Sequence, residues 1–304
     1  MTEYDRARDF IYRNARPIDL ARWKYLFEDG SREEVVACLS AYQNKDGGFG
    51  HALEPDCWNE RSTPLQTWTA TRIIKEIDFE DTTNPLILGI LDYLESGDEF
   101  DGHRWHGLNT VKSNNDYPHA PWWAYLHETE TSFNPTASLI GFILKYAPKG
   151  SPLHQKACGL AREAYADFKK RFPLDSMHEI ACFVELYGYI KECQEQNLVD
   201  LDEFFGLLKQ QISMAITYQT DTWLTEYVCK PSMFIAASKS DFYADNQNIC
   251  GFECDFIRKT QNSDGTWSVN WSWSEYPQQW AISKNWWKSD IIIKNMAFIK
   301  AFGL

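Results

Sequence analysis

The sequence predicts an all-α protein, an (α/α)6 toroid in which six helical hairpins close into a ring. Three features point to this fold class: apolar residues recur at helical spacing along the whole chain, short segments rich in Gly, Pro and Asp interrupt them, and one turn-forming fragment recurs between helices. A hairpin of amphipathic helices cannot bury its apolar face alone, so neighbouring hairpins must pack side by side. We therefore expect one domain over residues 1–304. The twelve expected helices cover 3–13, 17–28, 31–43, 64–77, 84–96, 134–147, 151–170, 176–192, 201–219, 227–239, 248–261 and 286–302.

Local signals mark where several of these helices begin. Ser31 with Glu34 has the pattern of a capping box, in which each residue bonds to a free backbone amide of the other. Thr63 and Asn134 each precede a proline, a residue that is favoured in the first turn of a helix. We therefore expect the side chains of Ser31, Thr63 and Asn134 to cap the helices that follow them.

A fragment with glutamine, Asp-Gly and an aromatic residue recurs where helices end. The two sharp copies are QNKDGGFG, from Gln43 to Gly50, and QNSDGTW, from Gln261 to Trp267. Looser copies are DGHRW at Asp101–Trp105 and QTDTW at Gln219–Trp223. In each sharp copy we expect the glutamine to hold the helix end, Asp-Gly to form a tight turn, and the aromatic ring to fold back onto the helix pair.

These units resemble the QW-type repeats of the terpenoid cyclase and protein prenyltransferase α/α-toroid superfamily, and the resemblance runs from roughly residue 30 to the end of the chain. The segment GGFGHALEPD, followed by STPLQTWTA, also resembles bacterial proteins described as prenyltransferase-like or squalene-cyclase-like. The resemblance implies a central apolar cavity, surrounded by inner helices, that holds an isoprenoid chain.

The residues that carry chemistry in that superfamily have no counterpart here. Class II cyclases have an Asp-x-Asp-Asp-Thr-Ala run, whereas the best match, Ser132–Ala137, keeps Thr and Ala without a carboxylate. Because neither Asn nor Ser can protonate an alkene, we expect no polyene cyclisation through Asn134. There is no Asp-Asp-x-x-Asp run for magnesium diphosphate, and Glu253-Cys254-Asp255 has the wrong order for the Asp-x-Cys zinc site of protein prenyltransferases.

Charge and composition exclude several function classes. The formal charge of −13 would repel nucleic acids and anionic membranes, and no basic patch offsets it. The eight cysteines show no zinc-like CxxC spacing, although Cys250 and Cys254 would share one face of a helix. The N-terminus MTEYDRARDF lacks the apolar core of a signal peptide, and no apolar run is long enough to span a membrane. We therefore expect a cytoplasmic protein.

The segment from His51 to Asp56 is the sharpest candidate for catalysis. The proline after Glu54 favours an extended backbone there, which would place the carboxylates of Glu54 and Asp56 on one side, roughly 6 to 7 Å apart, next to the imidazole of His51. Such a set suits acid–base catalysis, a divalent metal ion or a sugar ligand. The alternative is a structural loop whose carboxylates cap helix 64–77 and bind backbone amides.

Three further candidates for catalysis stand near the expected starts of inner helices, where a toroid brings distant residues to one rim. They are His178, Glu226 and Asp290. Taken singly, an acidic residue in the first turn of a helix is usually a complement to the helix dipole.

Aromatic residues make up 15% of the chain, and they cluster in the two longest expected loops, 97–133 and 262–285, and at the edges of these loops. They either line a hydrocarbon cavity or form platforms on which sugars stack, whereas Trp267 is expected to pack against helices. The candidates for ligand binding are Trp122, Trp123, Trp271, Trp273, Trp280 and Trp287.

Two functional hypotheses follow. The first is an enzyme related to the terpenoid cyclases and prenyltransferases that acts on an apolar, isoprenoid-like small molecule and lacks the class II acid. The alternative is a carbohydrate-active or carbohydrate-binding toroid, or a toroid that binds a ligand without catalysis. A divalent metal ion is compatible with either, and the sequence does not identify the cofactor.

Overall fold

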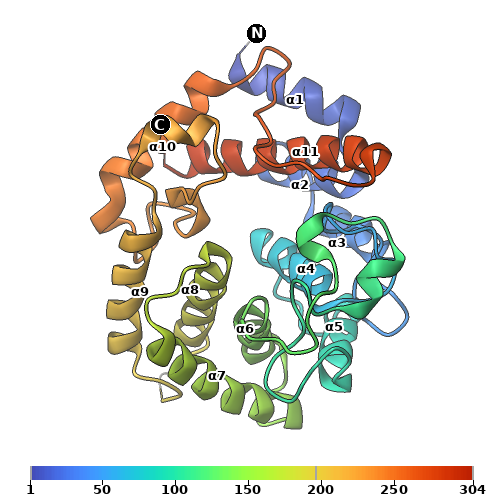
Figure 1. Cartoon of the computed structure of the whole chain (residues 1–304), viewed down its shortest axis with the longest axis vertical. Coiled ribbons are helices and arrows are strands. Elements are labelled where there is room, and N and C mark those ends of the chain that lie inside the picture. Colours follow the sequence, from blue (N-terminus) through green and yellow to red (C-terminus); the bar gives the residue numbers. More distant parts are fainter. Residues whose placement is uncertain (1, 196, 303–304) are drawn as a thin grey trace. The chain divides into compact units, whose positions relative to one another are not determined.

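The structure of the chain is a computed structural model that describes residues 2–195 and 197–302 (Figure 1). Within these ranges every regular element is helical, with eleven α-helices, five short 3-10 helices and no strand. The prediction of an all-α protein is therefore confirmed. The chain forms two compact units, residues 1–39 with 216–304, and residues 40–215. No helix in the described ranges is both long enough and apolar enough to cross a membrane.

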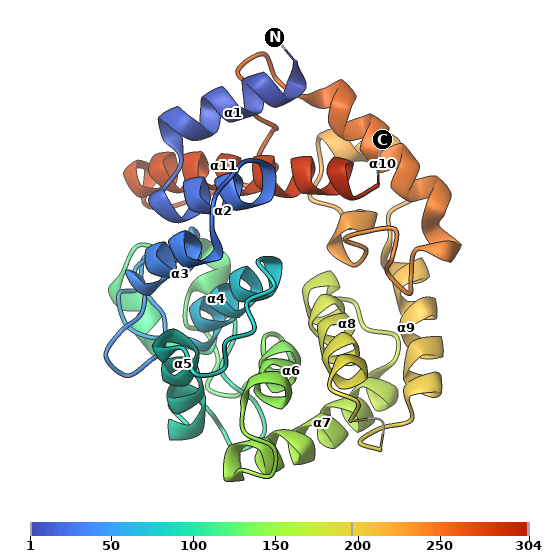
Figure 2. The ribbon, with the colours of Figure 1, turned by 180° about the vertical axis from the view of Figure 1, so that it is seen from behind.

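The first unit, residues 1–39 with 216–304, joins both ends of the sequence. Helix α11 packs against α1 and α2, and α10 packs against α11, so the last helices of the chain lie beside the first (Figure 2). The elements of this unit are α1 (Glu3–Asn14), α2 (Pro17–Phe27), most of α3 (Arg32–Ser40), η3 (Thr220–Leu224), η4 (Pro231–Met233), η5 (Ala244–Asn246), α10 (Gln247–Thr260) and α11 (Pro277–Ala301).

The second unit, residues 40–215, is built around α6 (Thr136–Tyr146), in which every residue except Lys145 is buried. Helices α4, α5, α7 and α8 all contact α6. A side chain at Gly141 would meet the ring of Tyr189 at 2.3 Å, so this glycine permits the close approach of α6 and α8. The other elements are α4 (Pro64–Glu76), α5 (Pro85–Ser96), η1 (Lys112–Asp116), η2 (Pro121–Trp123), α7 (Pro152–Arg171), α8 (Met177–Glu192) and α9 (Leu201–Ala215).

A buried aromatic cluster holds α7, α8 and α9 together in this unit. The ring of Phe168 lies 4.8 Å from Phe183 and 5.6 Å from Phe204, and Phe133 lies 5.8 Å from Phe183, measured between centroids. All four side chains are fully buried. Rings of this size supply a large share of the apolar area that a helical core removes from water.

Two of the three expected caps are present. The hydroxyl of Thr63 accepts the amide of Gln66, and that of Ser31 accepts the amide of Glu34. The expectation for Asn134 is wrong, because helix α6 begins at Thr136 and its cap residue makes no side-chain bond. The carbonyl of the Asn134 side chain instead accepts the thiol of Cys182.

Helices α3 and α9 end at Ser40 and Ala215, three and four residues earlier than expected, and two other expected elements differ more. Residues 227–239 form no α-helix and contain only η4, because Pro231 lacks an amide hydrogen and Lys230 before it is extended. Helix α11 begins at Pro277 and not at residue 286, so the expected loop 262–285 is shorter. Proline in the first turn of α11 was the sequence signal for this earlier start.

The two sharp copies of the repeated fragment form the same turn. The side-chain amide of Gln43 donates to the carbonyls of Gly47 and Leu86, and that of Gln261 donates to the carbonyls of Gly265 and Glu3. Each glutamine thus holds its own turn and also reaches the start of another helix, α5 or α1. These side-chain amide bonds go to these two places and not, as expected, to the end of the preceding helix.

The remaining parts of the fragment behave as expected in these two copies. Gly47 and Gly265 have φ of +87° and +88°, the left-handed region that glycine enters freely. Phe49 and Trp267 are buried. The loose copy at Gln219–Trp223 differs, since it contains a 3-10 helix in place of this turn.

Candidate functional site

The loop from His51 to Asp56 is a tight local structure and not an extended segment. His51 and Ala52 both have left-handed backbones, with φ of 59° and 58°, which is uncommon for residues other than glycine. The amide of Cys57 donates to the carbonyl of Glu54, which closes a turn. Pro55 and Asp56 are the central residues of this turn, so residues 54–56 do not form the continuous extended segment that was expected.

The side chains of this loop make contacts that hold the loop itself. The carboxylate of Glu54 accepts the amide of Asp56 at 2.8 Å, as the structural alternative predicted. His51 Nε2 lies 2.9 Å from the side-chain oxygen of Asn44. Asp56 is buried, and its carbonyl accepts the amide of Ala120. The helix cap at α4 comes from Thr63 and not from these carboxylates.

A buried amide network lies beneath this loop. Gln66, fully buried on α4, accepts the amide of Leu53 and donates to the carbonyl of Asn59. The side chain of Asn59 donates to that of Asn114 at 2.9 Å, and Asn114 donates to the carbonyl of Trp123. These bonds join the loop before α4 to the long segment between α5 and α6. Because every buried amide here has a partner, the network fixes one arrangement of both loops.

Three other predicted residues lie in the same unit. Trp122 and Trp123 form η2, where Trp123 is buried and Trp122 is partly exposed. His178 lies partly exposed in the first turn of α8. Its buried neighbour Glu179 accepts the amide of Phe133 and pairs with Arg171, so this carboxylate ties the α7 and α8 ends to the segment before α6.

Asp290 and Glu226 do not stand at the starts of inner helices as expected. Asp290 lies in the middle of α11 and pairs with Arg22 at 2.9 Å and with Lys294 at 2.7 Å. Although burial alone would raise the pKa of Asp290, the cations Lys294 and Arg22 lower it well below its usual range. Glu226 is exposed after η3, and no helix follows it directly. Asp290 therefore serves a buried ion network that joins α2 and α11.

The four predicted tryptophans of the first unit form two pairs. Trp271 packs edge-on against Trp287 at 5.2 Å, and Trp273 stacks on Trp280 at 5.6 Å, measured between ring centroids. Trp280 and Trp287 belong to α11 and not to a loop. The predicted residues thus divide between the two units, and their convergence on one rim remains a prediction.

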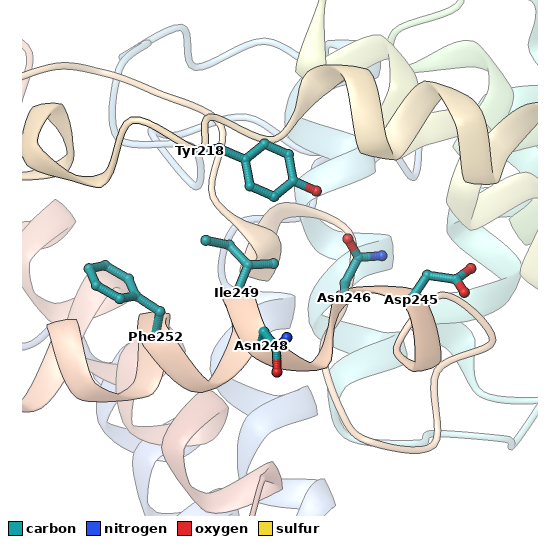
Figure 3. A pocket seen from close by; sticks show the side chains of 6 residues that line it. All are labelled: Tyr218, Asp245, Asn246, Asn248, Ile249 and Phe252. Atoms are coloured by element: carbon teal, nitrogen blue, oxygen red, sulfur yellow. The ribbon is translucent and has the colours of Figure 1, made fainter.

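A pocket of about 400 Å³ opens at the start of α10, within the first unit (Figure 3). Its polar wall consists of amides, a carboxyl group and a phenol, and its apolar wall of one aliphatic and one aromatic side chain. The lining residues are Tyr218, Asp245, Asn246, Asn248, Ile249 and Phe252. None of the six is a candidate on the sequence alone.

Local structure positions the pocket residues. Asn246 ends η5 and precedes α10, and its buried side chain donates to the carbonyl of Phe242 at 2.8 Å. Ile249 and Phe252 are three residues apart on α10 and therefore share one helix face. Tyr218 follows Thr217, whose amide donates to the carbonyl of Cys229. The pocket thus forms between a held loop and the first turns of a helix.

A buried carboxyl group follows Phe252 on the same helix. Glu253 accepts the amide of Ser232 at 2.8 Å and its hydroxyl at 2.5 Å. Burial raises the pKa of Glu253 to about 7, although the bonds from Ser232 and the charge of Lys230 act in the opposite direction. In the sequence, Glu253 stands out only as part of a misordered zinc pattern, because its partner comes from a segment expected to be helical.

No arrangement in the described ranges points to a metal site: no three His, Cys, Asp or Glu side chains there are placed to hold an ion. Every cysteine is a free thiol. Burial raises the pKa of Cys250 to about 12, so this thiol is neutral and a poor ligand or nucleophile near neutral pH.

Comparison with known proteins found no matching family model, no matching curated protein and no matching solved structure.

Proposed function

We propose that this chain binds a small, uncharged, hydroxylated ligand of carbohydrate type in the pocket at the start of α10. The composition of that pocket carries the proposal. Asn246, Asn248 and Asp245 offer amide and carboxyl groups of the kind that bond to hydroxyls, while Tyr218 and Phe252 offer aromatic surface for the C–H face of a sugar ring. A volume of about 400 Å³ lies in the range of small-molecule sites.

Charge argues against an anionic ligand at this place. No Lys, Arg or His side chain is among the six that line the pocket, and Asp245 contributes a negative charge. The chain as a whole carries a formal charge of −13. A phosphate or diphosphate group would therefore be repelled unless a cation accompanied it.

A second candidate, an enzyme acting on an isoprenoid-like substrate, is favoured by the repeated turns. The glutamine turns after α3 and α10 support the proposal of an α/α toroid, because Gln43 bonds to the start of α5 and Gln261 bonds to the start of α1 in the same way. In the toroid superfamily that these repeats resemble, the ring surrounds an apolar cavity. An experimental structure in which the hairpins form no continuous ring would refute the toroid.

Binding measurements separate the two candidates. The protein is titrated calorimetrically with a panel of mono- and disaccharides and, in parallel, with farnesyl diphosphate plus Mg²⁺. We expect at least one saccharide to bind and farnesyl diphosphate not to bind. Tyr218→Ala and Asn248→Ala should each raise the dissociation constant of the saccharide about 5- to 30-fold, since a lost stack or amide pair is worth about 1 to 2 kcal/mol. Both residues are exposed, so the fold should survive.

Matched controls come from the same unit. Tyr12→Ala and Asn14→Ala remove an exposed tyrosine and an exposed asparagine from α1, which is distant in sequence from the pocket residues. These variants should leave the affinity for the saccharide unchanged. Binding of farnesyl diphosphate with no saccharide bound would favour the isoprenoid candidate. Equal losses in the pocket variants and the controls would refute the pocket as the site.

A further inference from the structure

Glu253 is buried at the centre of a chain of contacts that ends at the pocket. Both of its carboxyl oxygens are occupied by Ser232, one by the amide and one by the hydroxyl. Ser232 belongs to η4, in a segment that contains no α-helix. Through these two bonds, one side chain on α10 anchors η4.

The anchored segment is in turn bonded to the residue before Tyr218. The carbonyl of Cys229 accepts the amide of Thr217 at 2.9 Å, and the indole of Trp223 donates to the carbonyl of Thr217 at 2.8 Å. Trp223 also packs edge-on against Phe252, which lines the pocket. Both backbone groups of Thr217 are thus fixed, which sets the direction from which Tyr218 reaches the pocket.

We propose that Glu253 is a positioning residue for the pocket: by anchoring Ser232 it holds the segment that fixes Thr217, and so keeps Tyr218 in place over the ligand. The nature of the ligand rests on the proposed function. The anchor, which is the contact of Glu253 with Ser232, does not depend on it. A neutral Glu253 keeps both bonds, since its carbonyl accepts the amide and its hydroxyl donates to Ser232. An ionised Glu253 is a buried charge, which local opening and hydration would relieve.

The charged and titratable groups around Glu253 are few. Lys230 comes from the η4 segment, and its ammonium lies against the ring of Phe256 at 4.7 Å. Cys229 comes from the same segment, and Cys250 and Cys254 come from α10. Burial raises the pKa of these thiols away from neutrality and lowers that of Lys230, while the pKa of Glu253, the carboxyl group of this cluster, is about 7.

Hydrogen exchange of the full-length protein tests the anchor directly. Protection factors for peptides covering Thr217 and Ser232 are expected to fall roughly tenfold between about pH 6 and about pH 8.5, because the ionised anchor opens. In Glu253→Gln, a neutral mimic, they should stay level. Asp255→Asn, which removes an exposed carboxylate from the same helix, should behave like the wild type.

Ser232→Ala provides a second variant that keeps the ionisable group. Loss of the hydroxyl bond, which favours the charged form, should move the fall in protection to higher pH. Protection that is level in the wild type, or that falls equally in Glu253→Gln, would overturn the anchor.

Titration with cellobiose over the same range links the anchor to the ligand. The dissociation constant should rise several-fold towards high pH in the wild type and less than about twofold in Glu253→Gln, following the population of the closed segment. If protection falls as expected but cellobiose binds at neither pH, the carbohydrate proposal is refuted for this probe and the anchor is confirmed.

Discussion

Gly47 and Gly97 share a left-handed backbone but differ in the space around them. Gly47 has φ of +87°, and a side chain there would meet the carbonyl oxygen of Gly89 at 1.9 Å. Gly97 has φ of +77° at the end of α5, and a methyl group there would have no atom within 4 Å. A side chain at Gly97 would therefore meet backbone strain alone, whereas one at Gly47 would meet backbone strain and a steric clash.

Alanine at the two positions should destabilise the protein to different extents. Gly97→Ala is expected to cost about 1 kcal/mol, the strain of a left-handed alanine. Gly47→Ala adds a clash with backbone that has no free rotamer, so it should cost several times as much, on the order of 3 kcal/mol or more. Urea denaturation measures both, and equal losses would contradict the close approach at Gly47.

Glu253 should make the stability of the fold fall as the pH rises. The pKa of this carboxyl is about 7 in the folded chain and 4.5 when it is unperturbed, so between these values the folded state binds a proton that the unfolded state has released. The contribution to stability is fully present below about pH 4.5 and is lost as the pH rises through 7. The slope is at most about 1.4 kcal/mol per pH unit.

The variant Glu253→Gln isolates this effect. The difference in unfolding free energy between variant and wild type should grow in favour of the variant from about pH 5 to about pH 7 and then level off. Asp255→Asn serves as the exposed control and should show no such trend. A constant difference across this range would show that Glu253 does not titrate there.

At the scale of elements, each of the two glutamine turns links the end of one helix to the start of another. Gln261 bonds to carbonyls of Glu3 and Gly265 and accepts the guanidinium of Arg6, so a single side chain joins the turn after α10 to α1. Gln43 joins the turn after α3 to α5 through Leu86. The same fragment thus does the same work in both units.

Removing either glutamine should cost more than removing an exposed one. Gln43→Ala and Gln261→Ala each remove two partly buried hydrogen bonds to backbone carbonyls, which should cost about 1 to 3 kcal/mol. Gln155→Ala removes an exposed glutamine that bonds to the carbonyl of Gly150, and its cost should be within about 0.5 kcal/mol. Chemical denaturation compares the three, and similar values for all would contradict the linking role.

Helices could be predicted from the sequence wherever apolar periodicity and capping residues determine where a helix lies. Periodicity and the caps at Ser31 and Thr63 located real helices. The helix expected over residues 227–239 is wrong, because the prediction followed the apolar pattern of this segment and neglected Pro231. The segment is bonded instead to Glu253, a tertiary contact that no local signal in the sequence reveals.

At the scale of the whole molecule, the pocket depends on residues that the sequence keeps apart. Tyr218 and Asn246 are brought together by the bonds of Thr217 and by the turn before α10, so neither residue carries a signal in its own neighbourhood. The candidates His51, Glu54 and Asp56 follow from their chemical type. The structure accounts for Glu54 by its bond to a backbone amide, and their catalytic role remains a prediction.

The proposal that a saccharide binds at the start of α10 is tested most directly by methyl NMR of isoleucine-labelled protein. Ile249 lines the pocket, whereas Ile282 is exposed on α11 and serves as the internal reference. On titration with the saccharide that gives the strongest heat of binding, the Ile249 methyl signal should shift in a saturable way. In Asn248→Ala the dissociation constant read from that shift should rise about fivefold or more. A saturable shift of other methyl signals with Ile249 unmoved, or no shift at all, would contradict the proposal.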